Sequence, residues 1–319
     1  MKVVITRKLP GDAELKIKNS SHDVWVYEGD AAIPRELLLE KVENADAIIT
    51  LLTDKVDSEL LDKAKNLKVV ANYAVGFDNI DIKECRKRGV VCTNTPDVLT
   101  QATADLTWAL LMSSARRIVE GHKMTEAGQY KGWAPDLLIG QDVWGSTLGI
   151  FGAGRIGRAV AERAQGFNMQ VIYTDEFNWK EGEENLGAKK VDFETLLKES
   201  DFLSLHAPLL SSTEKIFNFN AFKKMKKTSI LLNAARGGLI DEPDLYRAII
   251  EGEILGAGLD VYDPEPPEKN NPLLYLDQVV LAPHTGSASV NSRNGMADLA
   301  AQNVINVLSG IDPVTPIKG

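Results

Sequence analysis

The chain has 319 residues, which is long enough for two domains of about 150 residues, each with its own hydrophobic core. It carries 36 Lys and Arg residues against 45 Asp and Glu residues, a net charge of −9, so it lacks the basic surface that binding to nucleic acid or to an anionic membrane requires. We therefore expect a small-molecule ligand, no nucleic-acid partner and no membrane partner.

The N-terminal segment MKVVITRKLP begins directly with a strand pattern and a turn, without the charged, apolar and cleavage regions of a secretory signal. We therefore expect a cytoplasmic protein. Cys85 and Cys92 are too few for a disulfide framework, and no other ligand residues cluster with them. The sequence predicts two reduced thiols and no metal site.

Residues 1–98 alternate short apolar segments with amphipathic ones. Strands are expected at VVIT, AIITLL, VVANYAV and VVCTN, and the segments between them have the 3.6-residue period of helices. This alternation is typical of βαβ units, so residues 1–98 are predicted to form an α/β domain with a parallel sheet.

A long helix is predicted next. Thr100 is expected to cap it, and its sequence QATADLTWALLMSSARRIVEGHKM is apolar around much of its circumference, as expected for a helix packed between larger bodies. The following GQYKGWAPDLLIGQDVWG has no periodic pattern and is expected to form a projecting arm or loop that contains Trp133 and Trp144.

From residue 148 the alternation resumes, with strands expected at LGIFGA, MQVIYTD, DFLSLHA, SILLNAA, GAGLDVY and VVLAPH. Such apolar strands are typical of a parallel sheet covered on both faces. The final helix is expected to pack on the long helix or on the first domain. The sequence therefore predicts two doubly wound α/β domains, one comprising residues 1–98 and 290–319 and the other residues 99–289.

The segment LGIFGAGRIGRAV predicts a dinucleotide site. Gly152, Gly154 and Gly157 have the GxGxxG spacing between a strand and a helix, and Asp175 ends the next strand about 20 residues later. Asp175 is suited to accept hydrogen bonds from ribose hydroxyls, and with Glu176 it should repel a 2′-phosphate, so NAD is expected rather than NADP. A solvated Asp-Glu turn is the alternative.

Three polar residues follow strands of the second domain, where ligands of open α/β sheets bind. They are Arg236, Glu265 and His284. Reduction of a 2-keto acid by a nicotinamide needs a proton donor, a carboxylate that orients and charges it, and a cation that binds the substrate carboxylate. These residues supply the three groups, although Arg236 could instead cap a sheet edge and Glu265 could be a solvated charge.

The other histidines are weaker candidates for the proton donor. His22 and His122 are expected to be solvated. His206 also ends a strand, but a proline follows it and no suitably placed acid does, so we expect it to line the cofactor. His284 is therefore the predicted acid–base residue.

The motifs NAARGGLIDEPDL, GAGLDVYDPEPP and APHTGSAS, behind the GAGRIG loop, resemble the D-isomer-specific 2-hydroxyacid dehydrogenases over nearly the whole chain. The resemblance implies a Rossmann cofactor domain inserted into a flavodoxin-like substrate domain, with Arg236, Glu265 and His284 as the catalytic set. It also implies that Asp260 and the backbone around Ala234 hold the nicotinamide carboxamide.

The same resemblance implies the remaining site residues. The backbone at Val75 and Gly76 would receive the substrate carboxylate, Leu52 would line the same cleft, and Trp133 would reach the active site of a partner subunit in a homodimer. Substrate contacts are thus expected at Leu52, Val75, Gly76, Trp133, Arg236 and His284. Cofactor contacts are expected at Gly152, Gly154, Arg155, Ile156, Gly157, Asp175, His206, Pro208, Thr213, Ala234, Asp260 and Gly286.

Within the family, AVGFDNID and GWAP are most similar to glyoxylate and hydroxypyruvate reductases. Two positions differ from related branches: Asp175 replaces a Ser-Arg type of ending, which argues against NADP, and Val75 stands where the phosphite-oxidising branch has a lysine. The alternative functions are an NAD-sensing scaffold similar to transcriptional corepressors and a dehydrogenase of D-lactate or phosphoglycerate.

Overall fold

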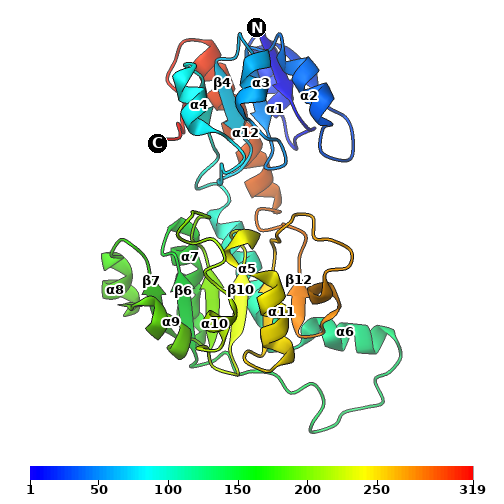
Figure 1. The fold of residues 1–319 in the computed structure, drawn as a ribbon, viewed down its shortest axis with the longest axis vertical. Helices are drawn as coiled ribbons and strands as arrows, with labels where there is room; N and C mark the ends of the chain where they lie inside the picture. The colour runs from blue at the N-terminus through cyan, green and yellow to red at the C-terminus, as the bar shows by residue number, and fades with distance from the viewer. Residues whose placement is uncertain (319) are drawn as a thin grey trace. The chain divides into compact units, whose positions relative to one another are not determined.

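Two parallel sheets organise the chain, one in each of two compact units (Figure 1). The computed structural model describes residues 1–318. Unit 1 contains Met1–Leu99 and the described residues from Ser287 on, and unit 2 contains Thr100–Gly286. The chain therefore leaves unit 1, builds unit 2 as one continuous segment and returns to unit 1.

Unit 1 has a five-stranded parallel sheet of order β2-β1-β3-β4-β5, the flavodoxin-like order that was predicted. Its strands are β1 (Lys2–Ile5), β2 (Asp23–Val26), β3 (Ala47–Thr50), β4 (Val69–Asn72) and β5 (Val91–Thr93). Its helices are α1 (Ala13–Asn19), α2 (Arg35–Val42), α3 (Ser58–Lys63), α4 (Ile82–Lys87) and α12 (Val290–Leu308).

Helices cover both faces of this sheet. Val4, Ile48 and Val70 alternate with their strand neighbours and pack with α2, α3 and α4, whereas α1 and α12 pack together and α12 also contacts β3 and β4. Cys85 and Cys92 are buried free thiols on the α2–α4 side. The C-terminal helix is therefore part of the first unit.

Unit 2 has a seven-stranded parallel sheet of order β12-β11-β10-β9-β6-β7-β8, which contains the Rossmann strand order. Its strands are β6 (Thr147–Phe151), β7 (Gln170–Thr174), β8 (Lys189–Lys190), β9 (Phe202–Leu205), β10 (Ile230–Asn233), β11 (Gly256–Leu259) and β12 (Val279–Leu281). Its α-helices are α5 (Thr100–Ala115), α6 (Ile118–Glu126), α7 (Arg155–Arg163), α8 (Lys180–Leu186), α9 (Phe193–Glu199), α10 (Phe219–Phe222) and α11 (Glu242–Ile250).

The prediction of one long helix after Thr100 is wrong. Thr100 is the first helical residue rather than the cap, α5 ends at Ala115, and Arg117 has a left-handed backbone with φ 52°. The carbonyl of Ala115, which would accept a hydrogen bond within a continuing helix, instead accepts the N–H of Gln141 at 2.8 Å. The N–H of Gln141, in the segment after α6, therefore replaces the helical N–H that would have bonded to Ala115 if α5 had continued.

The arm itself has no helix or strand between residues 129 and 146, as predicted, and its Trp133 and Trp144 are 83% and 69% exposed. None of the helices within residues 1–318 combines the length and apolarity needed to cross a membrane.

Candidate active site

The glycine loop between β6 and α7 needs glycine for three different reasons. Gly152 has φ +94°, and a Cβ there would lie 2.6 Å from the backbone nitrogen of Ala207. A Cβ on Gly157 would lie 2.2 Å from the carbonyl oxygen of Gly152, so this residue permits the close approach of helix and loop. Around Gly154 the space for a Cβ is open, which leaves room for a ligand to approach the backbone.

The first turn of α7 is suited to bind phosphate. Gly154 is its N-cap and provides no side-chain cap, so the backbone N–H groups that begin at Arg155 and Ile156 face outward at the positive end of the helix dipole. Open space at Gly154 and these donors together fit the pyrophosphate of a dinucleotide.

Asp175 stands directly after β7 and connects that strand to the glycine loop. Its Oδ2 accepts the N–H of Ala153 at 2.7 Å, and its Oδ1 accepts the N–H of Phe177 at 2.9 Å. A carboxylate has about four acceptor sites, so it can still accept hydrogen bonds from a ribose. The exposed Glu176 adds a second negative charge beside it.

The segment after β9 lies against this loop. The His206 N–H donates to the carbonyl of Phe151 at 2.7 Å, and the Thr213 hydroxyl holds the following turn by donating to the carbonyl of Pro208 at 2.7 Å. The His206 ring is partly buried beside the Ser204 hydroxyl, which lies 2.7 Å from Nε2, and burial lowers its pKa to about 3. His206 is therefore neutral near neutral pH and is poorly suited to donate a proton.

We expect the stability of the protein to depend on His206 at acidic pH. An unfolded histidine takes up a proton near its ordinary pKa of 6.5, whereas folded His206 does so only near pH 3, so this residue lowers the free energy of unfolding as the pH falls below 6.5. The Tm of His206→Gln should therefore rise relative to the wild type between pH 7 and pH 5 in roughly that window. His122→Gln, a change at an exposed histidine, is the matched control, and parallel Tm curves for His206→Gln and wild type would contradict the expectation.

His284 and Glu265 form a pair at the ends of neighbouring strands. His284 follows β12 and Glu265 follows β11, and Nδ1 of the histidine is hydrogen-bonded to Oε1 of the glutamate. Both side chains are partly exposed, so a ligand can reach them. Because Glu265 occupies Nδ1, Nε2 is the ring nitrogen that can face a substrate.

The backbone at His284 is held in a left-handed conformation, with φ +52°, which is uncommon for residues other than glycine. The N–H of His284 donates to the carbonyl of Asp260 at 2.9 Å. The buried Asp260 carboxylate accepts the N–H groups of Thr285 and Gly286 at 2.7 and 2.8 Å, and burial raises its pKa. Asp260 therefore positions the turn that carries His284, and its contact with a nicotinamide stays a prediction.

Glu242 is a positioning residue that the sequence analysis did not identify. It lies in the first turn of α11 and is buried, which raises its pKa. Its Oε1 accepts the N–H of Asp263 at 2.8 Å, and its Oε2 accepts an amide hydrogen of Asn271 at 2.5 Å. These bonds hold the loop that contains Glu265. The place of Glu242 within the NAARGGLIDEPDL motif was the only available signal.

Arg236 comes three residues after the end of β10. Gly237, the residue after it, contacts the loop that contains Glu265. A Cβ on Gly237 would lie 2.0 Å from the backbone of Tyr262, so these two segments are in close contact. The strands β10, β11 and β12 are neighbours, and the three predicted catalytic residues therefore follow adjacent strands at one edge of the sheet.

In unit 1, the predicted substrate residues also follow adjacent strands. Leu52 comes after β3, and Val75 and Gly76 come after β4. The side-chain amide of Asn94 donates to the carbonyl of Val75 at 2.7 Å, and that of Asn72 donates to the carbonyl of Gly76 at 2.8 Å. These bonds fix the loop while Leu52, Val75 and Gly76 remain partly exposed.

Comparison with known proteins identifies close relatives. A family model for the NAD-binding domain of D-isomer specific 2-hydroxyacid dehydrogenases matches residues 108–286. A glyoxylate reductase of Thermococcus litoralis is 50% identical over 316 residues, covering 98% of this chain and 95% of its own. The TT0316 protein of Thermus thermophilus has a TM-score of 0.95 and 44% identity, with full coverage of both chains. An NADPH-dependent glyoxylate/hydroxypyruvate reductase of Sinorhizobium meliloti, solved with NADP and malonate, has a TM-score of 0.85 and 30% identity, covering 99% of this chain and 96% of its own.

Proposed function

Because the chain belongs to the D-isomer-specific 2-hydroxyacid dehydrogenase family, we propose that it reduces small 2-keto acids, with glyoxylate and hydroxypyruvate as the leading substrates, to D-2-hydroxy acids. The observation that carries the proposal is the hydrogen-bonded pair of Glu265 and His284, which follow β11 and β12, while Arg236 follows β10 on the other side of β11. The bound nicotinamide supplies the hydride that goes to the keto carbon.

The residues of this chain perform the other steps. His284 donates a proton from Nε2 to the carbonyl oxygen as negative charge develops there. Glu265 orients the ring through Nδ1 and stabilises its protonated form. Arg236 binds the substrate carboxylate with its planar guanidinium group and polarises the carbonyl.

The two units have separate roles in this proposal. Residues 1–98 and 290–319 form the substrate domain, in which the N–H groups of Val75 and Gly76 receive the substrate carboxylate and Leu52 lines the site. Residues 99–289 form the NAD-binding domain, and the contacts expected at Arg155, Ile156, Pro208, Thr213, Ala234, Asp260 and Gly286 belong to it. The cytoplasmic location stays a prediction from the sequence.

A panel of 2-keto acids, assayed by the absorbance of NADH and of NADPH, tests the proposal. We expect the highest kcat/KM with glyoxylate or hydroxypyruvate. A higher value with pyruvate or with phosphohydroxypyruvate would favour the D-lactate or phosphoglycerate alternative. A protein that binds NADH and reduces none of these acids would favour the NAD-sensing scaffold.

The wild type should prefer NADH to NADPH. Asp175 and Glu176 present two carboxylates where a 2′-phosphate would lie, and each charge-assisted bond that the phosphate fails to make is worth about 1.5 to 3 kcal/mol. Asp175→Ala should narrow the ratio of kcat/KM for the two cofactors. Asp175→Asn removes the charge but has only one acceptor oxygen, so it can keep only one of the hydrogen bonds from the N–H groups of Ala153 and Phe177. Glu184→Ala, at an exposed acid on α8, is the control. A wild type faster with NADPH at equal concentration would contradict the preference, and the Sinorhizobium meliloti relative shows that such enzymes exist.

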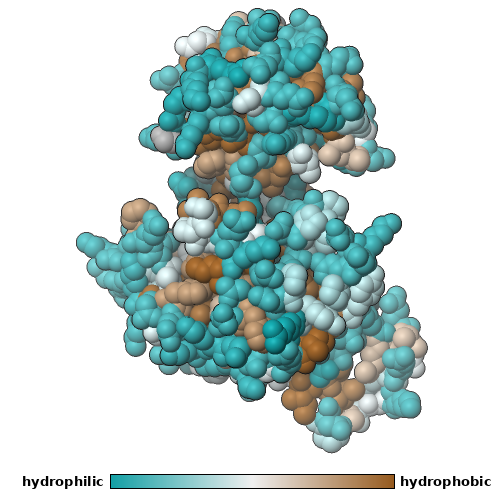
Figure 2. All heavy atoms as spheres, in the orientation of Figure 1, coloured by the Kyte–Doolittle hydropathy of each residue, from teal (hydrophilic) through white to brown (hydrophobic). Residues whose placement is uncertain are grey.

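We also propose a homodimer that uses the arm and α6 of unit 2. Figure 2 shows apolar side chains gathered over this part of unit 2. The exposed apolar residues there are Ile118, Val119, Tyr130, Trp133, Leu137, Ile139 and Trp144. Monomeric proteins rarely expose apolar patches of this kind, which usually mark an interface.

Sedimentation at micromolar concentration should therefore give a dimer. If Trp133 completes the partner's pocket, Trp133→Ala should change the ratio of kcat/KM between keto acids more than it changes the Kd for NADH. Ile250→Ala removes another exposed apolar side chain of unit 2, at the end of α11, and should leave both quantities near their wild-type values. A wild-type monomer would contradict the proposal.

A further inference from the structure

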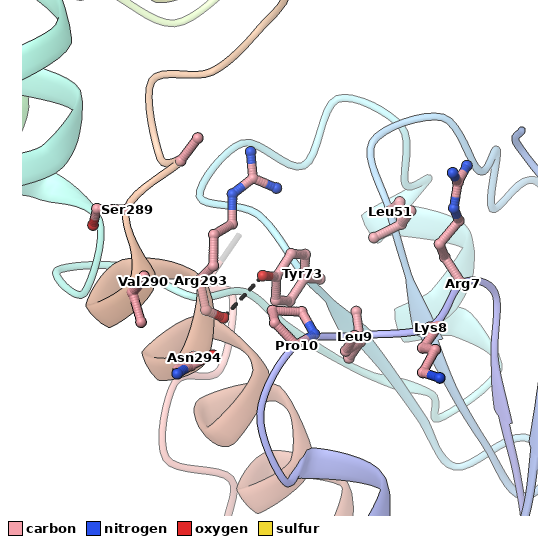
Figure 3. Close-up of a pocket in the computed structure, with 11 residues that line it drawn as sticks. Arg7, Lys8, Leu9, Pro10, Leu51, Tyr73, Ser289, Val290, Arg293 and Asn294 are labelled. Carbon is pink, nitrogen blue, oxygen red and sulfur yellow. Dashed lines mark hydrogen bonds between the residues drawn. The ribbon is translucent and has the colours of Figure 1, made fainter. Parts of the chain in front are cut away.

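Unit 1 contains a pocket of about 640 Å³ that the proposed reaction does not use (Figure 3). Arg7 and Lys8, which follow β1, line it together with Leu51, which follows β3, and Tyr73, which follows β4. Arg293, in the first turn of α12, completes it, and the Tyr73 hydroxyl donates to the carbonyl of Arg293 at 2.9 Å. The pocket thus joins segments from both ends of the chain.

Its position follows from the order of the sheet. From β1 the chain runs to β2 on one side and then crosses to β3 on the other side, so the connections that leave β1 and β3 diverge. In open α/β sheets a crevice forms at the carboxyl ends of such strands, and ligands bind there. Arg7 and Leu51 stand at the two sides of this crevice.

The pocket is cationic in a protein whose net charge is −9. Arg7, Lys8 and Arg293 line it, and its lining contains no Asp or Glu residue. Within residues 1–318 none of the three forms an ion pair with a carboxylate, and Arg7 donates only to the backbone carbonyl of Asp30. In Figure 3 the guanidinium groups of Arg7 and Arg293 extend toward the same side, with Leu51 between them.

Arg293 has a side-chain donor that no protein group within residues 1–318 satisfies. Its Nε is enclosed and, among the residues that the structure describes, has no hydrogen-bond partner. A buried donor without a partner is destabilising, and more so when the group is charged. Because the Arg293 side chain as a whole is only partly buried, rotation of its guanidinium group would allow an oxygen of a bound anion to accept a hydrogen bond from Nε.

The start of α12 adds a second source of positive potential. Ser289, whose hydroxyl accepts the N–H of Ser292 at 3.3 Å, and Val290 line the pocket at the N-terminus of this 19-residue helix. The positive end of the helix dipole therefore faces the pocket. Leu9 and Leu51 provide partly exposed apolar walls.

We propose that this pocket binds an oxyanion group, a carboxylate or a phosphate, of a small molecule. The group can belong to a free anion or to the far end of a 2-keto acid that has a second anionic group. The second source rests on the proposed function: Leu51 precedes Leu52, and Tyr73 lies two residues before Val75, so the pocket adjoins the segments expected to bind substrate.

Binding of inorganic phosphate by the full-length chain is the first test, measured by calorimetry and by Tm at constant ionic strength. Arg7→Met and Arg293→Met should each raise the Kd roughly tenfold or more, as expected for the loss of one charge-assisted hydrogen bond. Lys63→Met, at a lysine of unit 1 that pairs with Glu43 outside the pocket, should bind as the wild type does. The Tm of Arg7→Met and of Arg293→Met is also measured without phosphate. A Tm near that of the wild type shows that the variant is folded, so that a raised Kd reports lost binding.

Phosphate binding that is absent from the wild type, or that survives unchanged in both pocket variants, would overturn the proposal. Kinetics with 2-oxoglutarate, which has a second carboxylate, and with glyoxylate, which has none, distinguish a substrate group from a free anion. A fall of roughly tenfold or more in the ratio of their kcat/KM values in the pocket variants identifies the second carboxylate of a substrate. An unchanged ratio together with lost phosphate binding identifies a free anion. Inactivity with both of these keto acids and with hydroxypyruvate would refute the proposed function and leave the phosphate result standing.

Discussion

Replacing His284 by Ala should lower kcat about 10²- to 10⁴-fold and leave the Kd for NADH nearly unchanged, since general acid–base help has this magnitude. In the proposed mechanism His284 contributes a proton rather than binding energy for the cofactor, whose phosphates are expected at the start of α7. Steady-state kinetics and a fluorescence titration with NADH measure the two quantities separately. Near-normal turnover in this variant would mean that another group donates the proton. His206 is a poor candidate for it, because burial lowers its pKa to about 3.

The Glu265→Gln variant tests whether the Glu265 carboxylate stabilises the protonated form of His284. It keeps the shape of the side chain next to Nδ1 of His284 but removes the charge that favours the protonated ring. Its activity should therefore decline at a lower pH than that of the wild type, so the basic limb of the pH profile shifts toward acid. Glu268→Gln, at an exposed position of the same loop, should leave the limb in place. An unchanged limb in Glu265→Gln would contradict the assigned role.

Replacing Arg236 by Ala should lower kcat/KM with glyoxylate at least about 100-fold, with KM raised and kcat lowered together. A bidentate guanidinium–carboxylate contact contains two charge-assisted hydrogen bonds of about 1.5 to 3 kcal/mol each. Part of that interaction strengthens as charge develops on the carbonyl oxygen, so both kinetic constants should change. Arg236→Lys keeps the charge without the planar fork and should recover only part of the loss.

Arg247→Ala is the matched control, because this arginine lies on the neighbouring α11 and pairs with Glu251 at the surface. It should leave kcat/KM near its wild-type value. A variant of Arg236 with raised KM and unchanged kcat would show that the arginine binds substrate and transition state equally, which would remove its proposed role in polarising the carbonyl.

Features that depend on neighbouring residues could be predicted from the sequence. The buried central strands are continuous apolar runs, so their positions were clear, and the strand, glycine loop and helix from Thr147 to Arg163 form one local unit. Residues such as Arg236 and His284 were identified because the carboxyl end of a strand is itself a local feature of the sequence. Weakly apolar elements were missed: β2 is a half-exposed edge strand, and β8 consists of two exposed lysines.

Other features depend on contacts between distant residues, and only the tertiary structure decided them. The end of α5 is set by the hydrogen bond from Gln141 to Ala115, and the position of the Glu265 loop by the buried carboxylate of Glu242. The cationic pocket joins Arg7 to Arg293 from opposite ends of the chain. Periodicity reports how one segment divides between core and solvent, but it contains no information on which distant segment will supply a hydrogen-bond partner or a neighbouring charge.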